Sequence, residues 1–156
     1  MAIRKIVKNG DDILRKKCKP VDTFDEKLGM LLDDMVDTLE AAQGAGLAGP
    51  QVGTLRRLCV IYDEELGFIE LVNPVIIKSS RKKKREVEGC LSCPDQWGYV
   101  TRPVRCVVRA QDRNGKTFEV TLSGLSSRCA FHELDHLDGK LFIDIVEEFV
   151  DINKEK

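Results

Sequence analysis

Apolar residues recur at helical spacing in the first third of the chain. Across residues 23–43, leucine, methionine and valine return every three or four positions, which places them on one face of an α-helix. Thr23, followed three residues later by Glu26, has the form of a capping box, and Gly44 is placed to end the helix. We therefore expect a long amphipathic helix over residues 23–43, preceded by a shorter helical segment near residues 10–17.

The middle of the chain changes to the pattern of short β-strands. Five runs rich in β-branched residues lie within residues 56–124, separated by glycine, proline or asparagine. The Asn-Gly pair at 114–115 is a hairpin signal, so we expect the last two strands to be antiparallel neighbours. Helical spacing returns over residues 124–138, and residues 140–150 are expected to form a strand or a short turn. Because helix, strands and helix follow one another without regular alternation, the pattern predicts an α+β fold.

Length and charge narrow the class of protein. The chain has 156 residues, 42% of them hydrophobic, so we expect residues 1–156 to form a single domain with one core. Its net charge of -1 provides no general attraction to nucleic acid or to a membrane surface. The run Arg81–Arg85 is interpreted first as a solvated surface and second as a contact for an anionic partner. Because no signal-peptide or membrane-spanning run is present, we expect a cytoplasmic protein with reduced cysteines.

Both histidines of the chain lie in the sequence HELDH, at positions 132 and 136. His132 and His136 are one helical turn apart on one face, which is the spacing that two imidazoles need to bind one metal ion. Glu133 lies beside them, within reach of a water on that metal. The alternative is an exposed helix with solvent-facing side chains. The absence of any other histidine favours the metal site.

A catalytic metal usually has three protein ligands and one open position, so a third ligand is required. A further histidine is absent, because position 142 is Phe142, and Glu147 and Glu148 fall in a predicted strand or turn. Cys90 and Cys93 follow a glycine that permits close approach of the backbone. Their Cys-x-x-Cys spacing has three interpretations: a redox pair, a closed structural zinc site with both histidines, or one ligand with a bystander.

Three blocks identify a family resemblance: GAGLAGPQVG at 44–53, EGCLS at 88–92 and HELDHLDG at 132–139. With them, the chain resembles the peptide deformylases. The resemblance implies an α+β catalytic domain in which antiparallel strands pack around a central helix that carries the HExxH motif. It implies hydrolysis of the N-formyl group of N-formyl-methionyl nascent peptides, releasing formate. A transient contact with the ribosome is expected, and no membrane or specific nucleic acid partner.

The resemblance also implies a metal centre and its chemistry. The ligands would be Cys90, His132 and His136, and Glu133 would be the general acid/base. They would hold one divalent ion, Fe(2+) in the cell, with Zn(2+), Ni(2+) or Co(2+) in the purified protein. Competing hypotheses are a small metallopeptidase that uses the same helix, and a noncatalytic protein with a structural zinc that also binds Cys93.

Five further residues receive roles from the resemblance. Gln51 and the backbone N–H of Leu91 would donate hydrogen bonds to the oxygen of the reacting carbonyl. Gly46 would offer backbone hydrogen bonds to the substrate, and Glu88 with Arg102 would form a buried ion pair near the ligands.

Two positions depart from the pattern of the family. Gly49 stands where alanine is usual, a change expected to cost little. Phe131 stands where glutamine is usual, and we expect it to affect packing behind the helix more than metal binding. The chain also ends soon after Phe149, short of the long basic helix that many relatives carry.

Overall fold

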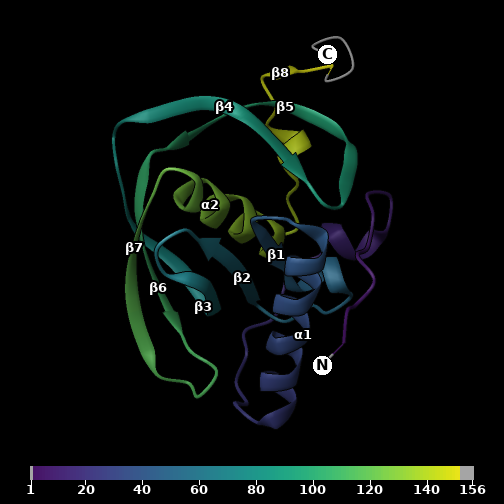
Figure 1. The fold of residues 1–156 in the computed structure, drawn as a ribbon, viewed down its shortest axis with the longest axis vertical. Helices are drawn as coiled ribbons and strands as arrows, with labels where there is room; N and C mark the ends of the chain where they lie inside the picture. The colour runs from purple at the N-terminus through teal and green to yellow at the C-terminus, as the bar shows by residue number, and fades with distance from the viewer. Residues whose placement is uncertain (1, 152–156) are drawn as a thin grey trace.

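The computed structural model describes residues 2–151 and has the predicted α+β fold (Figure 1). The described residues contain two α-helices, three short 3-10 helices and eight strands. In chain order they are η1 Asp12–Arg15, α1 Glu26–Ala42, β1 Gly46–Ala48, η2 Gly49–Val52, β2 Leu58–Asp63, β3 Gly67–Ser79, β4 Lys83–Cys90, β5 Cys93–Pro103, β6 Arg105–Gln111, β7 Thr117–Ser123, α2 Leu125–Leu137, η3 Phe142–Asp144 and β8 Glu148–Phe149.

The strands form two antiparallel sheets. The larger sheet has the order β1-β2-β3-β6-β7, and the smaller has the order β4-β5-β8. The predicted hairpin joins β6 to β7, with Gln111 opposite Thr117 across the Asn-Gly turn. The expected strand or short turn near the C-terminus is η3 followed by β8.

Helix α1 begins two residues later than the capping box at Thr23 predicts. Asp25 is the N-cap, and its carboxylate accepts a hydrogen bond of 3.0 Å from the backbone N–H of Leu28. The Asp25 carboxylate therefore satisfies one of the unpaired amides of the first turn, leaving the Thr23 hydroxyl to bond Asp22 instead. At the other end, the helix stops at Ala42, and its C-cap, Gln43, adopts the left-handed conformation just before Gly44.

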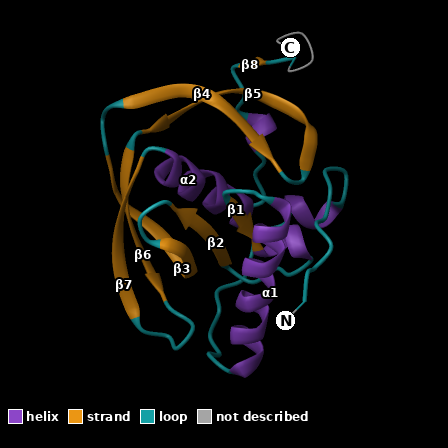
Figure 2. Cartoon of the chain, viewed as in Figure 1, coloured by secondary structure: helices purple, strands orange, loops and turns teal. Residues whose placement is uncertain are grey.

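Helix α2 lies between the two sheets (Figure 2). It contacts β1, β2, β6 and β7 of the larger sheet and β5 of the smaller one, so most of its circumference is buried. Burial on several sides accounts for its apolar residues, such as Ala130 and Leu137, but α2 also buries charged and polar side chains. Burying such a group without a hydrogen-bond partner costs several kcal/mol of folding free energy, on the order of 2–7 kcal/mol for an amide or hydroxyl. Their partners define the site described next.

Neither α-helix, nor any other helix in the described part of the chain, combines the length and apolar content that crossing a membrane requires.

Candidate metal centre and catalytic pocket

Cys90, His132 and His136 come together from two parts of the chain. Cys90 ends β4, and the two histidines lie on successive turns of α2. Their ligand atoms all lie within 4.8 Å of one another, and Sγ of Cys90 is 3.3 Å from Nε2 of His136. Within residues 2–151 this is the one such group of three potential ligands, and Cys93 is not part of it. One thiol and two imidazoles suit a transition metal with an open fourth position.

The orientation of His132 is set by Glu88 on β4. Oε1 of Glu88 lies 2.6 Å from Nδ1 of His132, and the pair is buried. Burial acts to raise the pKa of Glu88, but hydrogen bonds from His132 and Arg102 outweigh it and lower that pKa to about 2. An ionised carboxylate only accepts hydrogen bonds, so Nδ1 carries the hydrogen and Nε2 faces the ligand cluster.

His136 is held in its neutral form. Burial, followed by the nearby charges of His132 and Arg102, lowers its pKa well below the ordinary value. Neutral imidazole is the form that binds a metal ion. The other ring nitrogen, Nδ1, is buried with no hydrogen-bond partner among the described residues. The types of donor atom, their mutual distances and the neutral form of His136 therefore fit a divalent cation.

Glu133 is fully enclosed beside the ligands. Burial raises the pKa of its carboxyl group to about 7, and Oε1 has no hydrogen-bond partner in the described residues. Gly46 of β1 packs directly against it, because a Cβ built on Gly46 would lie 2.9 Å from Cδ of Glu133. A carboxyl group with a free oxygen and a pKa near neutrality can both accept and donate a proton.

Gln51 is held in place at both ends of its amide. Its Oε1 accepts a hydrogen bond of 2.9 Å from the backbone N–H of Ala48, and its Nε2 donates to Oγ of Ser92 at 3.1 Å. Nε2 also lies 3.7 Å from Sγ of Cys90. Ser92 and Leu91 form the tight turn between β4 and β5. The contribution of Ser92 was not predicted, although it belongs to the EGCLS block.

Residues 7–9, termed the N-terminal strap, connect η2 to the turn between β4 and β5. The backbone N–H of Val7 donates to the carbonyl of Gln51 at 2.7 Å, and that of Asn9 donates to the carbonyl of Ser92 at 2.8 Å. The strap thereby fixes the distance between η2 and the β4–β5 turn, a feature that the sequence did not indicate.

A pocket of about 610 Å³ is lined by seven of the nine predicted site residues. Its size falls within the range of roughly 300–1,000 Å³ that is usual for small-molecule sites. The polar lining includes Glu133, His132 and Gln51, and apolar side chains such as Trp97 and Leu125 complete the wall. The full set of predicted residues that line it is Gly46, Gln51, Glu88, Cys90, Leu91, His132 and Glu133. Of the predicted set, Arg102 and His136 lie behind this wall, in contact with Glu88 and Cys90.

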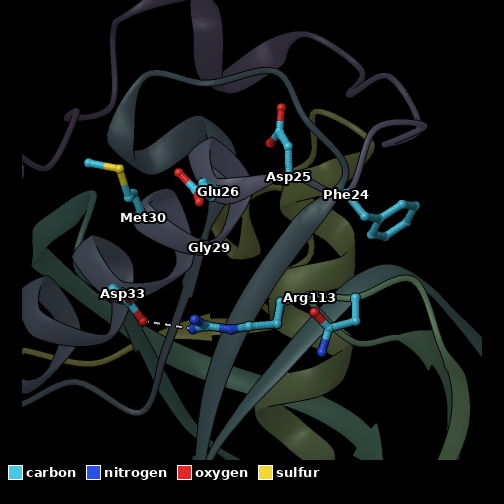
Figure 3. Close-up of a pocket in the computed structure, with 8 residues that line it drawn as sticks. Phe24, Asp25, Glu26, Gly29, Met30, Asp33 and Arg113 are labelled. Carbon is cyan, nitrogen blue, oxygen red and sulfur yellow. Dashed lines mark hydrogen bonds and ion pairs between the residues drawn. The ribbon is translucent and has the colours of Figure 1, made fainter.

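A second hollow lies at the start of α1 (Figure 3). Arg113 spans it and pairs with Asp33 at 2.7 Å and with Glu70 at 2.6 Å. Its cation is therefore satisfied by carboxylates of the protein, and the hollow brings together no group of metal ligands. The candidate site residues lie at the pocket beside α2 and not at this hollow.

The two departures from the family pattern have structural consequences. A Cβ on Gly49 would lie 2.7 Å from the backbone oxygen of Arg56, so alanine would require the backbone to move. The exchange of glycine and alanine is therefore not neutral in this chain, contrary to expectation. Phe131 is half-buried and packs against the core that contains Cys129 and Leu134.

Comparison with known proteins identifies the family. The model of the polypeptide deformylase family matches residues 3–151. The peptide deformylase of Caldicellulosiruptor bescii is 54% identical over 150 residues, which cover 96% of this chain and 89% of that protein. The structure of a peptide deformylase from Legionella pneumophila has a TM-score of 0.88 and 48% identity, covering 94% of this chain and 87% of that one. That of the Thermotoga maritima enzyme has a TM-score of 0.90 and 37% identity, covering 94% and 99%. The chain therefore belongs to the polypeptide deformylase family.

Proposed function

We propose that residues 1–156 act as a single catalytic domain that removes the formyl group from N-formyl-methionyl nascent peptides in the cytoplasm. The products are formate and a free amine. The observation that carries this proposal is the convergence of three ligand atoms within 4.8 Å beside the buried Glu133 carboxyl group. Because the substrate emerges from the ribosome, we also propose a transient ribosome contact.

Cys90, His132 and His136 would hold one divalent cation, Fe(2+) in the cell. A thiolate with two neutral imidazoles also suits Zn(2+), Ni(2+) or Co(2+), which can replace it during purification. When bound, the cation lowers the pKa of water and polarises the formyl oxygen. Glu88 serves this centre by holding the ring of His132 through Nδ1, and Arg102 holds Glu88.

Glu133 moves the proton. Its free carboxylate oxygen accepts the proton of the attacking water and then delivers it to the amine nitrogen as the C–N bond breaks. Enclosure of the carboxyl group by Gly46 and the rest of the pocket keeps bulk water from exchanging that proton.

Gln51 and Leu91 would stabilise the charge that develops on the formyl oxygen. The amide of Gln51 is oriented before substrate arrives by its bonds to Ala48 and Ser92, so it needs no reorganisation during the reaction. A donor fixed in this way is worth about 3 kcal/mol of transition-state stabilisation.

The substrate backbone would pair with β1. This strand is at the edge of the larger sheet, with β2 on one side only, and Gly46 brings it to the pocket. An extended peptide can add to such an edge through main-chain hydrogen bonds, while the apolar wall takes the methionine side chain.

Formate release from a formyl-methionyl tripeptide tests the proposal, with protein prepared anaerobically in Fe(2+). We expect Glu133→Gln to keep its metal and lose activity by about 10²–10⁴-fold, whereas Glu119→Gln on exposed β7 serves as the unchanged control. Full activity with full metal in Glu133→Gln would refute the assigned role. Cleavage of an internal peptide bond without formate release would support the metallopeptidase alternative.

A further inference from the structure

Arg128 is a buried arginine of α2 to which the reaction described above gives no role. The residue is only 6% exposed, and arginine is rarely buried unless it is paired. Its guanidinium donates to Oε2 of Glu88 at 3.0 Å, to the carbonyl of Val100 at 2.9 Å and to that of Lys84 at 2.7 Å. Because these partners belong to β4 and β5, Arg128 forms a fixed bridge from α2 to the smaller sheet.

The carboxylate of Glu88 receives two donors on each oxygen. Oε1 accepts from Nδ1 of His132 at 2.6 Å and from Nη2 of Arg102 at 2.8 Å. Oε2 accepts from Nε of Arg102 at 3.3 Å and from Nη1 of Arg128 at 3.0 Å. Arg128 therefore supplies the shorter of the two hydrogen bonds on the oxygen that His132 does not use.

Arg128 and His132 approach Glu88 from consecutive turns of the same helix. They are four residues apart in α2, a spacing that places side chains one above the other on one face. Each donates a hydrogen bond to a different oxygen of the Glu88 carboxylate. Together the two hydrogen bonds restrict the rotation of α2 and the rotation of that carboxylate.

We infer that Arg128 is a positioning residue for the metal centre: its hold on Oε2 of Glu88 keeps Oε1 against His132, whose Nε2 then faces Cys90. The inference rests on the proposed function in that it assumes a cation at this centre. Partners that orient a ligand in this way commonly change metal affinity by about 10–100-fold when removed.

The test is the affinity of the full chain for Co(2+), measured by competition with a chelator. Arg128→Gln removes the charge, and Arg128→Lys retains a single charged donor. Arg109→Gln is the matched control, because Arg109 is exposed on β6 and pairs with Glu119 away from the pocket. We expect affinity to fall by about 10–100-fold in Arg128→Gln, by less in Arg128→Lys, and not at all in Arg109→Gln.

A purely structural role for Arg128 would lower the melting temperature and leave both Co(2+) affinity and the Co(2+) absorption spectrum unchanged well below it. That result, or affinities within about threefold of wild type in both Arg128 variants, would overturn the inference. If Arg128→Gln does not fold, Arg128→Lys provides the decision. Formate release by the wild-type chain is measured separately. Its failure, together with Arg128-dependent Co(2+) affinity, would refute the proposed function and leave the inference standing.

Discussion

Alanine at Gly46 is expected to displace the carboxyl group of Glu133, the proposed proton carrier, without disturbing the fold. The new Cβ would lie 2.9 Å from both Cδ and Cγ of Glu133, whereas carbon atoms in contact are normally about 3.5–4.0 Å apart. Glu133 must therefore retreat by roughly 0.6–1 Å. The backbone of Gly46 does not require glycine, since its φ angle lies outside the left-handed region.

A displacement of about 1 Å can reduce a rate by about 10²-fold, which corresponds to about 2.7 kcal/mol in the activation barrier. We expect this loss in kcat/KM for formate release from a formyl-methionyl peptide, with metal content unchanged. Gly29→Ala is the matched control, because its Cβ would meet its nearest neighbour, Nη1 of Arg113, at an ordinary 3.5 Å. Helix α1 should then gain up to about 1 kcal/mol of stability with no change in activity.

The result that refutes this reasoning is Gly46→Ala with wild-type kcat/KM and full metal. It would show that Glu133 can work from a displaced position. Loss of metal together with activity would instead show that the added methyl group disturbs the ligands, so metal content must be measured on each sample.

Three further predictions concern the candidate ligands and the packing around them. Cys90→Ser should abolish or severely weaken metal binding, while Cys93→Ser should leave the metal stoichiometry unchanged. The metal content of the purified variants checks this, and one bound ion in both variants would exclude Cys90 as a ligand. Gly139→Ala should destabilise the fold by more than the roughly 1–2 kcal/mol that a positive φ alone costs, because its Cβ would also lie 2.7 Å from the backbone carbonyl carbon of Arg15 at the end of η1. Denaturant unfolding checks this against Gly53→Ala, a control in which φ is positive but the added Cβ meets no neighbour. Phe131→Gln should lower the melting temperature through lost apolar packing and leave kcat nearly unchanged, and a large gain in turnover at constant melting temperature would contradict it.

The pairing of the two candidate histidine ligands was predictable because its geometry is local. A helix places residues four apart on one face, so the sequence HELDH contains the relative position of His132 and His136. Cys90 is different, because it reaches the histidines only through the tertiary contacts between β4 and α2. Periodicity and spacing contain no such long-range information, and only the match of three separated sequence blocks distinguished it from Cys93.

Arg128 shows what the sequence pattern could not reveal. A charged residue in a helix is normally interpreted as solvent-exposed, and nothing in the residues around Arg128 indicates otherwise. It is buried because the two sheets cover opposite sides of α2, and its partners on β4 and β5 are distant in the chain. The start of α1 illustrates a smaller uncertainty: Thr23 and Asp25 can both cap a helix, and only the path of the backbone decides between them.

The N-terminal strap has a consequence for the order in which this protein can fold as it is made. Synthesis proceeds from the N-terminus at about 5–20 residues per second, so Val7 and Asn9 are made several seconds before the carbonyl of Ser92. His132 and His136 of α2 follow later still. A growing chain can therefore form the hydrogen bond from Val7 to Gln51 first, but it completes the strap only after Ser92 has been made and the candidate ligand set only after His136 has been made. The candidate catalytic pocket is therefore complete only after α2 has been made.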